Sequence, residues 1–183
     1  MPIASTWTHG NVLQIESPVF RDTQNAETGW LRLTPFGWGA QVVNEGHATV
    51  SWMHLPIPTV REPLNWGEQF TLRQVVLLFE CSDAIIDSVH IYDSHQKLQE
   101  FNNLALQGTF LTIGPQNTFQ LAPPKSVWTG IGLSFLFKPS ASTDVGTAGL
   151  GTLTVAGAGA YFETTSSLFA KFSATAAYRA GGH

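Results

Sequence analysis

The feature that most constrains the fold of this chain is the alternation of apolar and polar residues in short segments. Such alternation places successive side chains on opposite faces of a strand, and about ten segments of this kind follow one another. Glycine and proline separate the segments, and little of the chain shows the spacing of an amphipathic helix. The sequence therefore predicts an all-β protein, an antiparallel β-sandwich of jelly-roll-like type.

The same pattern predicts a single domain. The chain has 183 residues, and it contains no internal repeat and no linker. The β-sandwich is expected to span residues 1–163. Residues 164–183 would form a partly flexible C-terminal extension, because their apolar residues fit a short helix and a strand equally well.

The composition limits the classes of partner. Charged residues make up only 12% of the chain, against about a quarter in ordinary domains, so uncharged polar residues must cover the surface. The nine lysines and arginines are scattered and the net charge is −4, which argues against a nucleic-acid partner. No stretch approaches about 18 uninterrupted apolar residues, and the first residues lack the pattern of a signal peptide. We therefore expect no membrane contact and a cytoplasmic location.

The candidate site is organised around the segment His47–Val60, HATVSWMHLPIPTV. Its alternation predicts a strand in which every second residue from Ala48 to His54 shares one face, apolar until His54. The two prolines that follow remove backbone donors and are expected to end the strand in a stiff loop. A histidine near Trp52 at the end of a strand is a favourable place for a functional site.

Two further strands are predicted on either side of a turn at Ser82-Asp83. The first, Gln69–Cys81, is apolar on both faces in its second half, which suits the middle of a covered sheet. The second, Ile85–Asp93, would direct Ile85 inward and His90 outward.

The clearest strand pattern lies in Ser126–Lys138. Gly130, Gly132 and Ser134 occupy one face of this strand and leave it nearly bare, so a ligand or another chain segment could lie against it. The opposite face is apolar: Val127, Ile131, Leu133, Phe135 and Phe137.

The candidate catalytic residues are His54, His90, Tyr92 and Asp93. His54 near Asp93 or Tyr92 would form an acid–base pair, because histidine titrates near neutral pH and a carboxylate fixes its tautomer. The alternative interpretation is structural. In that case His54 donates a hydrogen bond to a backbone carbonyl, as His9 would, and Asp93 caps the turn that follows it.

The candidate ligand-binding residues are mainly aromatic: His9, Trp38, Trp52, Trp66 and Trp128. Exposed rings on a β-sandwich can stack on sugars or hold a terpenoid or aromatic ligand. The alternative is that at least half of the tryptophans fill the core.

Other kinds of site have weaker support. Three histidines and a carboxylate would suit zinc or iron, yet none of the local spacings resembles a ligand motif, so no metal and no cofactor is expected. The G-x-S-x-G motif of a nucleophilic serine is absent, and Ser134 lies in a strand pattern rather than at a strand-to-helix turn. Cys81, the only cysteine, cannot form an intrachain disulfide and is expected to be buried.

Five short motifs occur in the order Trp7–Gly10, Trp52–Thr59, Val89–Asp93, Gly130–Ser134 and Gly157–Phe162. In order and spacing they resemble an uncharacterised family of small β-sandwich proteins from bacteria and fungi. The resemblance covers roughly residues 7–162 and implies the same fold. It implies no activity, since none is known for the family.

These observations lead to several functional hypotheses. The first is a protein that binds a small hydrophobic or aromatic molecule in a largely apolar, aromatic-lined pocket edged by His, Tyr and Asp side chains. The second is a cofactor-independent enzyme on the same pocket, an isomerase, cyclase or lyase in which His54 or Asp93 moves a proton. A lectin-like module would instead present a flat row of tryptophans. A structural role would involve homo-oligomers formed through the C-terminal extension.

Overall fold

The computed structural model describes residues 4–17, 19–21, 28–45, 49–59, 70–140 and 151–164. These residues form twelve strands and two short 3-10 helices, which confirms the predicted all-β class. In chain order the elements are β1 (Ala4–His9), η1 (Gly10–Val12), β2 (Gln14–Ile15), β3 (Val19–Arg21), β4 (Thr28–Phe36), β5 (Gly39–Glu45), β6 (Ser51–Ile57), β7 (Phe70–Asp93), β8 (Gln96–Phe101), β9 (Leu106–Phe110), η2 (Pro115–Asn117), β10 (Thr118–Ser126), β11 (Ile131–Pro139) and β12 (Thr152–Thr164). Neither of the described helices is long or apolar enough to span a membrane. The cytoplasmic location stays a prediction.

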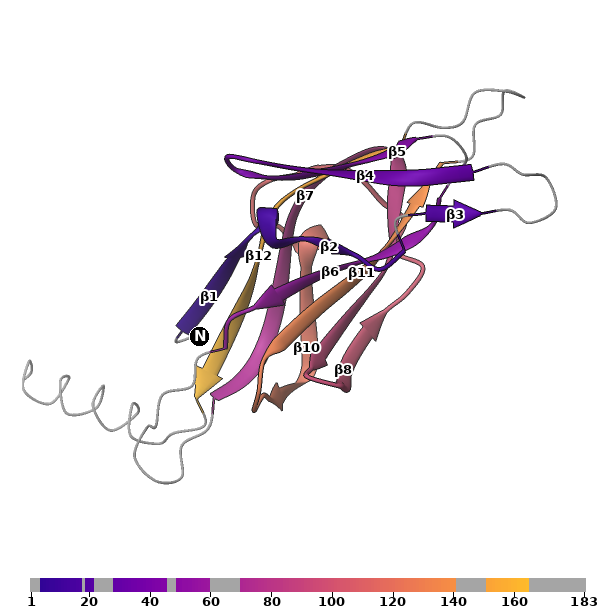
Figure 1. Cartoon of the computed structure of the whole chain (residues 1–183). Coiled ribbons are helices and arrows are strands. Elements are labelled where there is room, and N and C mark those ends of the chain that lie inside the picture. The colour runs from indigo at the N-terminus through magenta and orange to yellow at the C-terminus, as the bar shows by residue number, and fades with distance from the viewer. Residues whose placement is uncertain are drawn as a thin grey trace, which may run out of the picture.

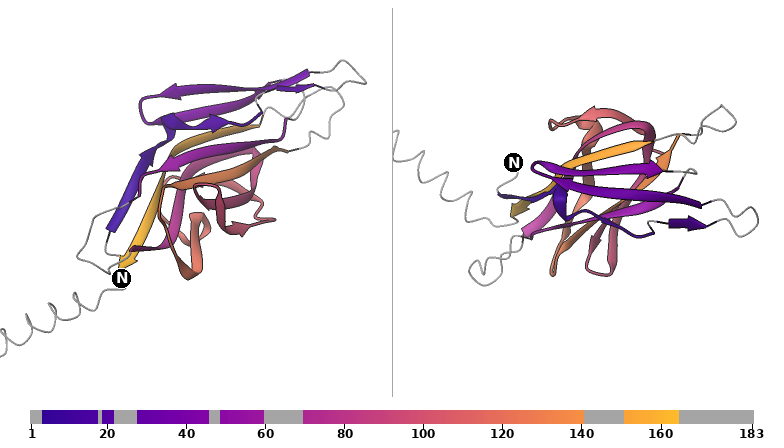
Figure 2. Two further views of the ribbon diagram at one scale, coloured as in Figure 1. Left: turned by 60° about the horizontal axis from the view of Figure 1, so that its bottom comes forward. Right: turned by 45° about the horizontal axis from the view of Figure 1, so that its top comes forward.

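The strands belong to one antiparallel sheet that folds over on itself (Figures 1 and 2). Its main order is β2-β6-β11-β7-β12-β5-β4-β3, while β1 pairs with β12, and β8, β9 and β10 pair with β7. One apolar core joins residues from distant parts of this order, such as Val42 on β5, Leu55 on β6 and Phe135 on β11. The folded sheet thus encloses its core between layers that remain hydrogen-bonded to each other.

The strand β7 runs for 24 residues and pairs with five other strands. The predicted turn at Ser82-Asp83 is wrong, because the strand continues through both residues, with Asp83 at a φ of 51°. Asp87 is an extra residue opposite β11, since Leu136 pairs with Ser88 and Phe137 with Ile86. These two irregularities change which side chains face inward.

One consequence is that Ile86, and not Ile85 as predicted, is fully buried in the second half of β7. Val89 and Ile91 are also fully buried, as the alternation predicts, and His90 lies on the other face.

The faces of β6 are the reverse of the prediction. Met53 and Leu55 point into the core with at most 1% of their surface exposed, while Trp52 and His54 lie on the opposite face and are half-buried. His54 is therefore not the end of a buried row. Pro56 lies within the strand, opposite Gly132 of β11, because the other neighbour, β2, pairs only as far as Gln14 and leaves this end of β6 as an edge.

Strand β11 begins at Ile131, later than the predicted Ser126, because residues 127–130 form a turn between β10 and β11. Its predicted apolar face is confirmed, since Ile131 to Phe137 are buried at every second position. Residues 165–183, which include nearly all of the predicted extension, lie outside the described residues.

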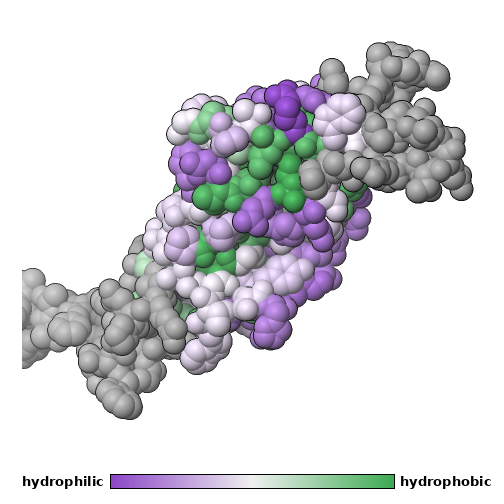
Figure 3. All heavy atoms as spheres, viewed as in Figure 1, coloured by the Kyte–Doolittle hydropathy of each residue, from purple (hydrophilic) through white to green (hydrophobic). Residues whose placement is uncertain are grey.

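The surface is mixed in polarity. Figure 3 shows apolar residues gathered between β4 and β2 on one face, with polar residues around them.

Candidate functional site

A polar row crosses five neighbouring strands on the outer face of the sheet. The register places Gln14 of β2 opposite His54 of β6, and His54 opposite Ser134 of β11. Ser134 is in turn opposite His90 of β7, which faces Glu100 of β8. Side chains opposite each other in antiparallel strands lie close enough to interact, so this row brings together residues distant in sequence.

The adjacent row is open because its central residue is Gly132. Gly132 lies between Pro56 on β6 and Tyr92 on β7. A Cβ built on Gly132 would meet only the Tyr92 Cβ, at 3.7 Å, and one on Gly130 would meet nothing within 4 Å. This confirms the bare face that the two glycines predict.

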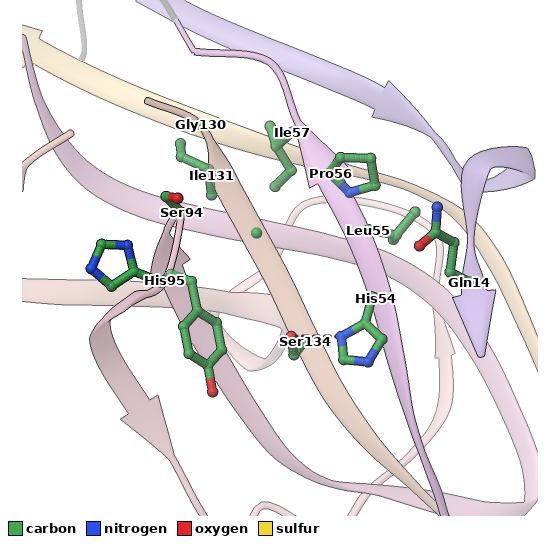
Figure 4. A pocket seen from close by; sticks show the side chains of 12 residues that line it. Gln14, His54, Leu55, Pro56, Ile57, Ser94, His95, Gly130, Ile131 and Ser134 are labelled. Carbon is green, nitrogen blue, oxygen red and sulfur yellow. Dashed lines mark hydrogen bonds between the residues drawn. The ribbon is translucent and has the colours of Figure 1, made fainter. Parts of the chain in front are cut away.

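Two hollows lie over this face. The larger, of about 580 Å³, is lined by Gln14, His54, Leu55, Pro56, Ile57, Tyr92, Ser94, His95, Gly130, Ile131, Gly132 and Ser134 (Figure 4). The smaller, of about 340 Å³, is lined by Glu16, Trp52, His54, His90, Tyr92 and Ser134. Because His54, Tyr92 and Ser134 line both, we treat the two hollows as one groove, called here the outer groove.

His54 stands near the middle of the outer groove with a partner on each ring nitrogen. Its Nδ1 is 2.9 Å from the Ser134 Oγ, and Figure 4 shows the ring and the hydroxyl side by side. Its Nε2 is 3.8 Å from a carboxylate oxygen of Glu16, the residue after β2. The side chains of His54 and Glu16 are 39% and 57% exposed, so the contact between them is largely open to solvent.

His90 is held more firmly. Its ring lies on Trp52, with centroids 4.5 Å apart and planes tilted by 39°. Its Nδ1 is 3.4 Å from the Tyr92 hydroxyl and its Nε2 is 3.4 Å from the Asn102 Oδ1. The side chain of His90 is only 15% exposed. These contacts hold the His90 ring in place, which fits a residue that forms the wall of the groove better than one that carries a proton.

The prediction that Asp93 joins His54 in an acid–base pair is wrong. The Asp93 carboxylate accepts hydrogen bonds from the backbone N–H groups of Trp128, Thr129 and Gly130, and from the Thr129 hydroxyl. Burial raises the pKa of Asp93, but these hydrogen bonds outweigh burial and leave the pKa below its usual range. Asp93 therefore has a structural role, but it holds the turn before β11 and not the turn after Asp93 that the structural alternative named.

The predicted binding residues are scattered. Trp52 lines the smaller hollow, but His9, Trp38 and Trp128 line neither of the two. The His9 Nδ1 accepts a hydrogen bond from the Asn11 N–H, as an N-cap of η1. Trp38 packs edge-on against Phe36 in the β4–β5 turn, and Trp128 is 66% exposed. Trp66 lies outside the described residues.

Ser134 and Glu16 line the outer groove but were not among the predicted site residues. The alternation of Gly130, Gly132 and Ser134 placed the serine on the bare face, which was the available signal. Nothing in the sequence showed that His54 would be its cross-strand neighbour, because register across distant strands is not a local property.

The described residues contain no group of three or more His, Cys, Asp or Glu side chains placed to hold a metal ion. Cys81 is buried, as predicted, and burial raises the pKa of its thiol to about 12. Its reactive thiolate form is therefore scarce at neutral pH.

The comparisons with known proteins add no assignment. No protein-family model matches the chain, and no curated protein matches it significantly. The resemblance to small β-sandwich proteins stays a prediction.

Proposed function

We propose that this protein binds a small amphipathic molecule in the outer groove. The observation that carries the proposal is the arrangement of the groove. The polar groups of His54 and Ser134 lie beside Gly130 and Gly132, which have no side chains and leave the base of the groove open. The larger hollow, of about 580 Å³, is within the range of about 300–1,000 Å³ typical of small-molecule sites.

The lining indicates how such a ligand would lie. Pro56, Ile57, Ile131 and Gly132 line the larger hollow together with Gln14, His54 and Ser134, so it offers both apolar and hydrogen-bonding contacts. An apolar portion of the ligand would cover the glycine floor, and a carbonyl or hydroxyl group would face the His54–Ser134 pair.

The lectin-like alternative has less support. It called for a flat row of exposed tryptophans, whereas Trp30, Trp38 and Trp128, which are among the more exposed rings described, lie on β4, in the β4–β5 turn and in the turn before β11. For the isomerase, cyclase or lyase alternative, His54 remains a candidate proton carrier, but Asp93 does not, because its carboxylate is bound to the backbone of Trp128 and Thr129.

A thermal-shift screen tests the proposal. The test compounds would be medium-chain alcohols and acids, phenols, terpenoid alcohols and simple sugars. A ligand of the native state raises the melting temperature with its concentration. We expect a rise with an amphipathic compound for the wild type and none for Gly132→Val, in which the added side chain fills the groove.

Gly37→Val is the matched control, because Gly37 lies in the β4–β5 turn, outside the groove, and has no atom within 4 Å of its Cβ position, while Gly132 meets only the Tyr92 Cβ at 3.7 Å. The proposal fails if no compound stabilises the wild type, or if Gly132→Val is stabilised as much as Gly37→Val.

A further inference from the structure

Ser134, His54 and Glu16 form a continuous chain of polar contacts. The Ser134 Oγ is 2.9 Å from the His54 Nδ1, and the His54 Nε2 is 3.8 Å from the Glu16 Oε2. A hydroxyl, an imidazole and a carboxylate in this order are the elements of a nucleophile, a general base and a group that orients the base.

The contacts favour one of the two proton positions on a neutral His54. A proton on Nε2 is favoured by the nearby Glu16 carboxylate, and the Nδ1 lone pair is then free to accept the Ser134 O–H. This is the arrangement in which an imidazole can remove the hydroxyl proton as the oxygen attacks. His90 differs, because its Nδ1 faces the phenol of Tyr92.

The Ser134 hydroxyl is accessible from the groove. Ser134 lines both hollows although only 8% of its surface is exposed, which suits a contact with a bound molecule better than with bulk water. Gly132, two residues before it on the same face, carries no side chain that would block an approaching carbonyl carbon. Tyr92 also lines both hollows, and its hydroxyl would have to turn away from the His90 Nδ1, 3.4 Å distant, to donate to a developing oxyanion.

We propose that the outer groove is an acyl-transfer site in which Ser134 attacks a small carboxylic ester, with His54 as general base and Glu16 as a positioning residue. This inference rests on the proposed function of the groove. The Ser134 Oγ forms a bond to the carbonyl carbon while its proton passes to His54. The ester C–O bond then breaks, and the alcohol leaves with that proton. Water, deprotonated by His54, hydrolyses the acyl-serine to the carboxylic acid and restores Ser134.

The test uses the full chain with two probes, a biotinylated fluorophosphonate and p-nitrophenyl butyrate. We expect a single phosphonyl adduct that peptide mapping assigns to Ser134, and ester hydrolysis above the buffer rate. Ser134→Ala should abolish the adduct, and His54→Ala should slow its formation at least about 100-fold. Ser82→Ala, which removes an exposed serine of β7 outside the groove, should label at the wild-type rate.

Glu16 has a separate readout. Because its contact with His54 is solvent-exposed, added salt should screen it and slow the labelling of the wild type. Glu16→Gln should label more slowly at low salt and lose this salt dependence. A purely structural role for Glu16 would leave the salt dependence unchanged.

The inference is overturned if Ser134 forms no adduct, or if His54→Ala labels as fast as the wild type. These outcomes differ from failure of the proposed function. A wild type that is stabilised by an amphipathic compound, with Gly132→Val unresponsive, but that forms no adduct at Ser134 remains a binding protein and is no acyl-transfer enzyme.

Discussion

The two faces of β6, β11 and the second half of β7 differ sharply although the same backbone carries both. On the inner face, Met53, Phe135 and Ile91 are fully buried in the apolar core. On the outer face, the alternate positions hold His54 and Ser134 beside glycine, and the groove lies above them. One face is therefore occupied by core packing, while the other is free to carry polar groups in a fixed geometry.

This difference predicts that substitutions of neighbouring residues have unequal effects. The inner face supplies apolar burial, which is the main source of stability, whereas the outer face supplies little of it. Substitutions on the two faces should therefore change the free energy of unfolding by different amounts.

The largest effect is expected for Phe135→Ala on the inner face. Removal of a fully buried phenyl ring leaves a cavity and should cost about 3–5 kcal/mol, measured by urea denaturation. The control is Leu136→Ala, the next residue on β11, which is only half-buried on the outer face and should cost clearly less. Equal losses for the two variants would contradict the proposed difference between the faces.

The sequence predicted the class of fold, but it did not predict for every strand which face is buried. Glycine, proline and alternation were sufficient for an all-β assignment, and on β11 they also identified the buried side correctly. They failed on β6 and the residue before it, where Trp52 and Val50 were predicted on the core side, yet Val50 is 51% exposed and Trp52 is only half-buried. Which face of a strand is buried depends on what covers it, and this information lies in other parts of the chain.

The candidate site was predictable only in part. His54, His90, Tyr92 and Trp52 do meet, because they lie on the same face of β6 and β7, on either side of β11. Asp93 is adjacent to Tyr92 in sequence, but the alternation of the strand places its side chain on the other face. The partner of His54 depended on the register of strands about 80 residues apart, which local patterns do not encode.

A smaller loss of stability is expected for Asp93→Asn. The amide cannot replace the charged acceptor of several hydrogen bonds, so the variant should lose about 1.5–3 kcal/mol at pH 7. The pKa of Asp93 is lowered by folding, so this stabilisation is present above the unfolded pKa of about 4 and is lost as the pH falls through the lower, folded value.

Urea denaturation at pH 7 and below pH 3 checks this. The difference between wild type and Asp93→Asn should shrink in acid, whereas the exposed Asp83→Asn should stay within about 0.5 kcal/mol of wild type at pH 7. A difference that grows in acid would contradict the role of the ionised carboxylate.

Two glycines should respond differently to the same change. A Cβ on Gly159 of β12 would lie 2.6 Å from the Trp7 ring, so Gly159→Ala should cost about 1–3 kcal/mol by overpacking. In Gly132→Ala the new Cβ makes only an ordinary van der Waals contact with Tyr92. The variant should be as stable as the wild type or slightly more stable, because glycine weakens a strand. Thermal melts of both variants test this, and a large loss for Gly132→Ala would show that the groove floor is packed.

The smallest effect on stability is expected for His54→Ala. The side chain is 39% exposed and its contacts to Ser134 and Glu16 lie on the outer face, so the variant should stay within about 1 kcal/mol of the wild type. Its loss of ligand-induced stabilisation should nevertheless be large, because the central polar group of the groove is gone. Urea denaturation with and without the ligand separates the two effects. If the variant unfolds instead, His54 is a structural residue and the outer groove is not the functional site.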